Sequence, residues 1–308
     1  MSPNFRLNEI SVVEFGVCLE SNEGEVYYLI PIDRGVKGAL KEMLKNTIDA
    51  LDLQGPEIEP YEASQKYGAM ERLKLPIDDQ MLEKVRQIYS SENIETNAGK
   101  IRDIHEIVYY FGIFRDSKNN KLLAVRRAGS FKGVIKAKNR LMQIMDETLK
   151  IVEDDIFKLD MEFDYIVFNQ MAYILRPSGF EYTAAIDTYI LQKAKESALH
   201  IARVMPFLDL ASLAEYVATH KRAARLIASI RSRRDINRTS RQKLTHECEK
   251  FGIELIRENT KWRPAEGHET EFLKLLDRRL YSSSLTDEED ELYEAANRKE
   301  IKPPLEGH

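Results

Sequence analysis

The sequence predicts an α+β protein in which an N-terminal antiparallel-sheet domain with helices precedes a mainly helical C-terminal domain. In the first half, paired apolar runs flank polar turns, which is typical of β-hairpins. After residue 180 the apolar residues recur at helical spacing instead. With 308 residues the chain is long enough for two domains. We therefore expect domains at 1–178 and 179–308.

The first predicted elements are a hairpin within residues 14–33 and a helix over about 35–51. The hairpin has apolar runs on both sides of a polar turn at 21–24. The helix has an apolar stripe that includes Leu40, Met43 and Leu44, and Gly55-Pro56 follows it. A second helix is expected near 78–89.

The hairpin pattern then recurs 96 residues later. "FGVCLESNEGEVYYL" (15–29) aligns without gaps on "FGIFRDSKNNKLLAV" (111–125), and "VKGALKEMLKN" (36–46) resembles "FKGVIKAKNRL" (131–141). Each copy would be a hairpin, a Lys-Gly pair and a helix, so a duplicated unit would make the N-terminal domain pseudo-symmetric. The alternative is that any two hairpins with polar turns look alike.

Another hairpin is expected at 163–177 around Asn169-Gln170, and helices follow at about 184–204, 210–217 and 221–233. Thr239 and Gln242 have capping-box spacing, so they should begin a helix that ends at Gly252. A short strand is expected at 253–256. Two last helices are expected at about 269–281 and from Thr286, which forms a capping box with Glu289.

Composition limits the possible locations of the protein. The longest uncharged stretch, 165–175, is too short to cross a bilayer as a helix, and the N-terminus lacks the apolar run of a signal peptide. Two cysteines 230 positions apart do not form a disulfide framework. We expect a cytoplasmic protein that reaches the inner membrane only through a partner.

A basic window stands out in this chain of net charge −5. Residues 219–243 contain nine Lys or Arg and one Asp, a net charge of +8. The apolar residues of 221–233 share one helical face and the cations the other. A phosphate at the start of the next helix would bind its free N–H groups and its basic first turn. The candidate DNA-binding residues here are Lys221, Arg222, Arg225, Arg231, Arg233, Arg234, Arg238, Arg241 and Lys243.

The alternative is a solvated basic face, or one paired with the acids of residues 244–308. A helix-turn-helix outline is also present, but most helical domains contain such a pair. A second window, 125–140, contains six cations and no acid. Gly129 and Gly133 would let backbone amides approach a phosphate there. Two such windows favour an extended polyanion, nucleic acid above all, bound through its backbone. The second set is Arg126, Arg127, Lys132, Lys136, Lys138 and Arg140.

No recognisable catalytic motif, P-loop or metal-ligand set is present, so we expect no catalytic residues, no metal and no cofactor. His246 and Cys248 are the one tight metal-like pair, and Cys248 fits the buried face of its helix. Trp262, between Lys261 and Arg263, could stack on a base or close a loop over the core.

Three stretches resemble the KwaB family of the Kiwa bacterial anti-phage defence system. They are "FDYIVFNQMAYILRPSGFEY" (163–182), the basic helix region, and the tail "LLDRRLYSSSLTDEEDELYEAANRKEI" (275–301). The resemblance covers about 105–301. It implies a cytoplasmic, oligomeric protein that binds DNA, works with the transmembrane partner KwaA, and hinders phage replication or transcription. It carries no catalytic residues.

Two other functions remain open. One is a metal-dependent nuclease with dispersed ligands, and the other is an interface for an acidic protein or anionic lipid. For DNA binding, the sequence predicts that changing Arg231, Arg233 and Arg234 to Glu abolishes binding without unfolding the protein.

Overall fold

The computed structural model describes residues 5–21, 24–53, 58–68, 71–92, 94–97, 99, 101, 106–129, 142–145, 148–151, 157–284 and 290–296. The chain forms two compact units, which are described separately. Unit 1 contains Met1–Tyr61 and Gly68–Ala185, and unit 2 contains Glu62–Tyr67 and Ile186–His308. The architecture is α+β, as the sequence predicts: a large, mainly antiparallel sheet in the N-terminal part and helices in the C-terminal part.

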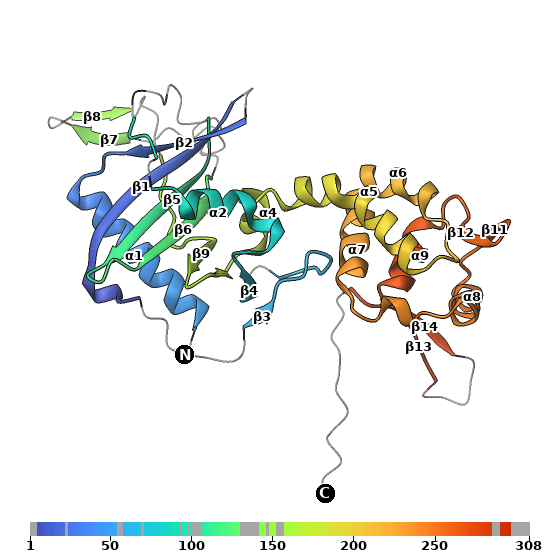
Figure 1. The fold of residues 1–308 in the computed structure, drawn as a ribbon. Helices are drawn as coiled ribbons and strands as arrows, with labels where there is room; N and C mark the ends of the chain where they lie inside the picture. Colours follow the sequence, from blue (N-terminus) through green and yellow to red (C-terminus); the bar gives the residue numbers. More distant parts are fainter. Residues whose placement is uncertain are drawn as a thin grey trace, which may run out of the picture. The chain divides into compact units, whose positions relative to one another are not determined.

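Unit 1 is built on an eight-stranded sheet with the order β2-β1-β5-β6-β9-β10-β4-β3 (Figure 1). Neighbouring strands pair antiparallel except β3 and β4, which are parallel. A separate two-stranded sheet joins β7 and β8. The strands are β1 (Ile10–Ser21), β2 (Gly24–Ile30), β3 (Glu59–Pro60), β4 (Leu73–Pro76), β5 (Ile107–Asp116), β6 (Lys121–Arg127), β7 (Met142–Met145), β8 (Thr148–Ile151), β9 (Tyr165–Phe168) and β10 (Met171–Ile174).

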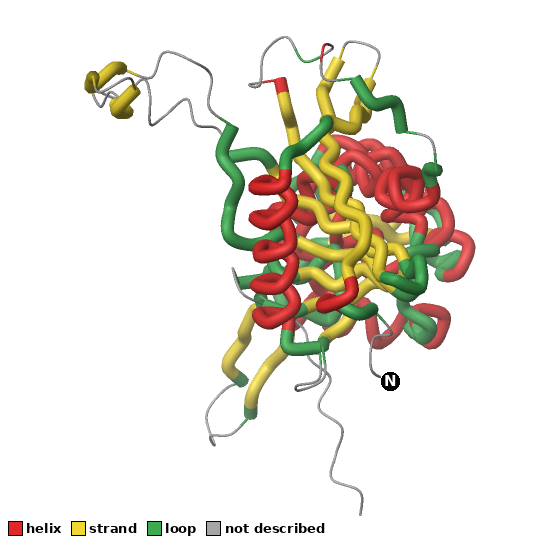
Figure 2. Tube along the Cα trace, turned by 90° about the vertical axis from the view of Figure 1, so that its left-hand side faces the viewer, coloured by secondary structure: helices red, strands yellow, loops and turns green. Residues whose placement is uncertain are grey.

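The expected long helix of unit 1 is confirmed as α1 (Arg34–Leu51). Asp33 caps it by accepting a hydrogen bond from the Val36 N–H at 2.8 Å. Its apolar face buries Leu40 and Leu44 among the sheet residues of the core, and Figure 2 shows the helix lying against the strands. The other described helices of unit 1 are short: η1 (Leu7–Glu9), η2 (Gln80–Leu82), α2 (Glu83–Ser90) and α4 (Pro177–Thr183).

The two similar hairpins, β1–β2 and β5–β6, meet through their first strands, with Val17 opposite Tyr110. A local two-fold axis between β1 and β5 would produce this strand order. The glycine of each Phe-Gly pair lies under an aromatic ring: a Cβ on Gly16 would lie 2.2 Å from Phe111, and one on Gly112 would lie 2.6 Å from Phe114. The second helix of the proposed duplication, at 131–141, falls outside the described residues, so the duplication stays a prediction.

The third hairpin is confirmed as β9–β10. Asn169 and Gln170 form its turn with φ values of 49° and 61°. These are the left-handed values that a two-residue hairpin turn requires at both positions.

Unit 2 is mainly helical, and α5 packs against α6 and α7. Its core includes Ile190, Ile201, Ile227 and Phe272, which are almost fully buried. The helices are α5 (Ile186–Val204), α6 (Ala211–Thr219), α7 (Lys221–Ser232), η5 (Ile236–Arg238), α8 (Arg241–Lys250) and α9 (Glu269–Leu276). Two hairpins complete the unit: β11 (Leu255–Glu258) with β12 (Lys261–Pro264), and β13 (Leu280–Ser283) with β14 (Glu291–Glu294).

Four local predictions for unit 2 differ from the structure. Helix α9 ends at Leu276, because Arg278 adopts a left-handed φ of 56°, and the chain then enters β13. Residues 291–294 form a strand rather than a helix, since the stacked rings of Tyr281 and Tyr293 join the two strands at 5.4 Å. Thr286 and Glu289 lie outside the described residues.

The other two errors are displacements of one or two residues. The cap of α8 is Ser240, not Thr239, since the Ser240 hydroxyl accepts from the Lys243 N–H at 3.2 Å. Strand β11 begins at Leu255, two residues later than the predicted strand at 253–256.

In the described part of the chain, no helix has the length and apolar character needed to cross a bilayer.

Candidate nucleic-acid interface

Helix α7 is amphipathic as predicted. Ala223, Leu226, Ile227 and Ile230 are buried, while Lys221 and Arg222 are exposed. The cations of the basic window divide into two groups, because some are paired with acids and others are not.

Two α7 cations share one carboxylate. The Arg225 guanidinium binds Asp187 at 2.7 Å and also donates to the Ala63 carbonyl at 3.0 Å, while the Lys221 ammonium lies 3.4 Å from Asp187. Desolvation is the largest single influence on the Asp187 carboxyl and raises its pKa, but Arg225 and Lys221 together lower the pKa overall. These cations bind within unit 2 itself.

Two more α7 cations have acidic partners. Arg222 binds Glu294 at 2.9 Å, and Arg231 binds Glu196 at 3.1 Å. Glu294 belongs to the acids of 244–308 that the sequence offers as partners, whereas Glu196 lies in α5. The face of α7 is therefore largely neutralised, although such exposed pairs add little to stability.

Arg233 has a structural role. Its side chain is 7% exposed, binds Asp235 at 3.0 Å and donates to the Leu276 carbonyl at the end of α9. Glutamate at position 233 would be buried against Asp235 and a carbonyl oxygen, which is strongly destabilising. The triple change of Arg231, Arg233 and Arg234 would therefore perturb folding as well as charge, and it does not test binding cleanly.

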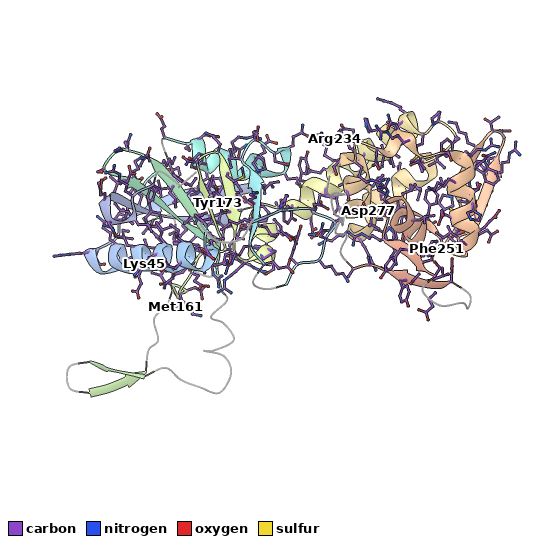
Figure 3. All side chains as sticks on the ribbon, turned by 90° about the horizontal axis from the view of Figure 1, so that it is seen from below. Lys45, Met161, Tyr173, Arg234, Phe251 and Asp277 are labelled. Carbon is purple, nitrogen blue, oxygen red and sulfur yellow. The ribbon has the colours of Figure 1, made fainter. Side chains whose placement is uncertain are left out.

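The remaining cations form what we call the α8 basic cluster: Arg234, Arg238, Arg241 and Lys243. All four are exposed, and within the described residues none has an acidic partner. They lie within ten consecutive positions around η5 and the first turn of α8 (Arg234 is labelled in Figure 3). The first turn of α8 has no acidic residue, so its positive end is available to an anion.

A cavity of about 340 Å³ opens beside this cluster. Arg238, Lys243 and Arg278 line it. Two acids also line it, Asp235 and Glu247, and Asp235 binds both Arg233 and Arg278. Partial burial raises the pKa of Asp235, but the hydrogen bond from Arg233 and the charge of Arg278 lower it overall, so the carboxylate stays ionised. The cavity wall thus exposes two unpaired cations.

The second basic window is divided in the same way. Arg126 is 18% exposed and binds the carboxylates of Asp160 and Asp164, and Asp164 also accepts from the Arg127 N–H at 2.8 Å. A Cβ on Gly179 would lie 2.1 Å from an Asp164 oxygen, so only glycine fits beside this pair. Arg126 therefore serves as a partly buried ion-pair partner within unit 1 and is not available to a phosphate.

Arg127 is exposed and lies over the Tyr182 ring at 3.9 Å from its centre, a cation–π contact that leaves its N–H groups accessible. It lines a cavity of about 430 Å³ with Arg126 and Arg176. The other predicted cations of this window, Lys132, Lys136, Lys138 and Arg140, lie outside the described residues.

Among the described residues, no three His, Cys, Asp or Glu side chains are grouped so that they could hold a metal. His246 is exposed whereas Cys248 is buried, and burial raises the pKa of the Cys248 thiol to about 12. The backbone of Trp262 ties β12 to residues 207–209, because its amide N–H donates to the Phe207 carbonyl at 2.9 Å and its carbonyl accepts from the Asp209 N–H at 2.8 Å. These are backbone hydrogen bonds, so the role expected of the Trp262 indole ring stays a prediction.

The family of the chain follows from a comparison with protein-family models. The model described as Kiwa protein KwaB-like matches residues 105–286, more than half of the chain. The chain belongs to the KwaB-like family. Membership of this family implies a role in Kiwa anti-phage defence. No curated protein and no solved structure matches the chain.

The matched region of this KwaB-like chain begins just before β5 and continues through α9 and β13. It therefore contains the α8 basic cluster and Arg127, but not β1, β2 or α1. The sequence located the basic windows. It could not identify the unpaired cations, since the acids that bind α7 lie 34 to 72 positions from their partners.

Proposed function

We propose that this KwaB-like protein is a DNA-binding effector of Kiwa defence that holds the sugar–phosphate backbone at the α8 basic cluster. The observation that carries the proposal is the group of four exposed cations at the start of α8 without acidic partners in the described structure. Their concentration contrasts with the net charge of −5 of the whole chain. A local positive surface on an acidic protein steers an anionic partner to one place.

The chemistry of the cluster favours phosphates over bases. Guanidinium groups donate to phosphate oxygens in pairs, and a helix N-terminus adds free N–H groups and a positive dipole end. Arg241 and Lys243 oppose that dipole when no anion is bound, so a phosphate would remove an unfavourable interaction. Binding through the backbone carries little sequence preference.

The same proposal includes the assembly that the family suggests. KwaA is the expected partner of a KwaB-like protein. We infer that the chain acts as a homo-oligomer, that KwaA recruits it from the cytoplasm to the inner membrane, and that bound DNA is withheld from phage replication or transcription.

Fluorescence anisotropy with duplex and single-stranded DNA across a salt series tests the proposal. Four phosphate contacts predict a slope of about −3.6 in log K against log salt, or roughly a 150-fold loss of affinity between 50 and 200 mM. Flat salt dependence, or no binding at 50 mM, would refute it. Incubating the same samples with Mg²⁺ or Mn²⁺ shows whether the DNA is cleaved, which would favour the nuclease alternative.

A further inference from the structure

A second basic surface lies in unit 1, in a groove between α1 and β1 that neither predicted window includes. The groove encloses about 530 Å³, and none of the described residues that line it is acidic or aromatic. Its lining includes Ser11 and Val12 of β1 with Arg34, Lys37, Gly38 and Lys41 of α1.

The cations of this groove lack acidic partners in the described structure. Arg34 and Lys37 are exposed, and Lys41 is bound to the Ile10 carbonyl at 3.0 Å, which leaves its charge uncompensated. Lys45 follows one turn later on the same helical face and is labelled in Figure 3. The first turn of α1 contains no acid, so Arg34 and Lys37 oppose the helix dipole, and Asp33 at the N-cap is the acid that offsets them at this end.

Gly38 has no structural reason to be glycine. It lies inside α1, where glycine is less stable than alanine, and a Cβ there would meet nothing within 4 Å. Its φ is not left-handed. The missing side chain instead leaves the helix backbone bare in the groove, between Lys37 and Lys41.

The same residue pattern occurs a second time in the sequence. Lys37, Gly38, Lys41 and Lys45 align with Lys132, Gly133, Lys136 and Arg140 in the matching of 36–46 with 131–141. All four positions keep either the positive charge or the glycine. The recurrence is a sequence observation that is independent of the groove.

We propose that the α1 groove binds the phosphodiester backbone of DNA, so that each unit contributes its own phosphate contacts. This inference rests on the proposed function and adds a second surface to it. No aromatic side chain is among the described residues of the lining, which disfavours base stacking, and cations without acidic partners there favour phosphates. A concave groove with a bare backbone suits a narrow strand of phosphates better than a flat bilayer.

The test compares two double variants of the full chain in the anisotropy assay. Arg34→Glu/Lys37→Glu reverses two groove cations. Lys74→Glu/Arg86→Glu makes the same charge change on β4 and α2 of unit 1, at positions without an acidic partner in the described structure. Two lost phosphate contacts reduce the salt slope by about 1.8. The loss of affinity between 50 and 200 mM salt should therefore be about 12 times smaller for the groove variant than for the wild type. The control variant should keep the wild-type slope.

Gly38→Gln separates binding from folding. It fills the groove without changing charge, so DNA affinity should fall while the midpoint of thermal unfolding stays or rises. Equal DNA binding by Gly38→Gln, by the groove variant and by the control would overturn the inference.

The failure of this inference differs from that of the proposed function. If wild-type protein binds no DNA, the proposed function fails. If wild-type protein binds and only the α8 cluster variants weaken it, the groove alone is refuted. Vesicles containing phosphatidylglycerol provide the remaining arm: loss of vesicle binding with unchanged DNA binding in Arg34→Glu/Lys37→Glu would make the groove a membrane surface and overturn the inference.

Discussion

Replacing Arg241 and Lys243 with glutamine should weaken DNA binding without destabilising the protein. Both side chains are exposed in the first turn of α8, and neither has an ion-pair partner in the described part of the chain. The change removes two cations from the positive end of a helix. The free energy of unfolding should therefore stay constant or rise by about 0.3–1 kcal/mol.

The expected loss of affinity follows from counterion release. Each neutralised phosphate contributes about 0.9 to the salt slope, so two contacts contribute about 1.8. At 0.1 M salt this corresponds to a dissociation constant roughly 60 times larger. The slope of log K against log salt should fall by the same 1.8. Fluorescence anisotropy with a labelled duplex measures both quantities.

The matched control replaces Lys221 and Arg222 with glutamine. These cations also lie in the first turn of a helix and are exposed, but Asp187 and Glu294 bind them. Their removal should change affinity and salt slope much less. Equal losses in the two variants would refute the argument that pairing decides which cations bind DNA, and an unaffected Arg241→Gln/Lys243→Gln variant would remove α8 from the interface.

Three further predictions concern the scaffold. Arg279→Ala should cost about 3–5 kcal/mol in urea unfolding, because it leaves Asp277, which is 1% exposed, without its buried ion-pair partner; a loss below 1 kcal/mol would show that the pair is dispensable. Gly179→Ala should cost at least about 1–3 kcal/mol, since the methyl group would overlap the Asp164 carboxylate, and unchanged thermal unfolding would contradict the close approach. Asp187→Asn should lower stability at pH 7 by up to about 1 kcal/mol. The pKa of Asp187 is lowered in the folded state, so its contribution is present above the unfolded pKa of 3.8 and is lost as pH falls below it. The stability difference between wild type and variant should therefore shrink as the pH falls below 3.8, and a constant difference would exclude the ion pair as the cause.

Local periodicity explains which parts of the fold were predictable. The β9–β10 hairpin and the buried face of α7 follow from turn residues and apolar spacing within a single segment. The sheet order was not predictable, because β4 pairs with β10 across about a hundred residues. The β13–β14 hairpin was missed, since helix-forming residues of the tail are overridden by pairing between strands.

The candidate site shows the same limit. Charge counting located the basic window at 219–243. The amphipathic spacing of α7 predicted that its cations lie on the face away from the buried residues. Partners such as Asp187, Glu196 and Glu294 come from other elements, so the paired and unpaired cations look alike in the sequence. The α1 groove was missed because its cations are spread along a helix that also contains acids, without a dense charge run.

The segment Glu62–Tyr67 has a consequence for how the protein can be divided. It belongs to unit 2, where Arg225 and Arg279 donate to the carbonyls of Ala63 and Ser64, yet the chain on both sides belongs to unit 1. After a protease cut between Ala185 and Ile186, residues 62–67 would stay in the N-terminal fragment. Their hydrogen bonds to Arg225 and Arg279 would hold the two fragments together without a covalent link. A fragment that starts at Ile186 would lack two hydrogen-bond acceptors for its arginines. Expressed alone, that fragment is not a complete folding unit, so deletion mapping of function in this chain needs 62–67 supplied with it.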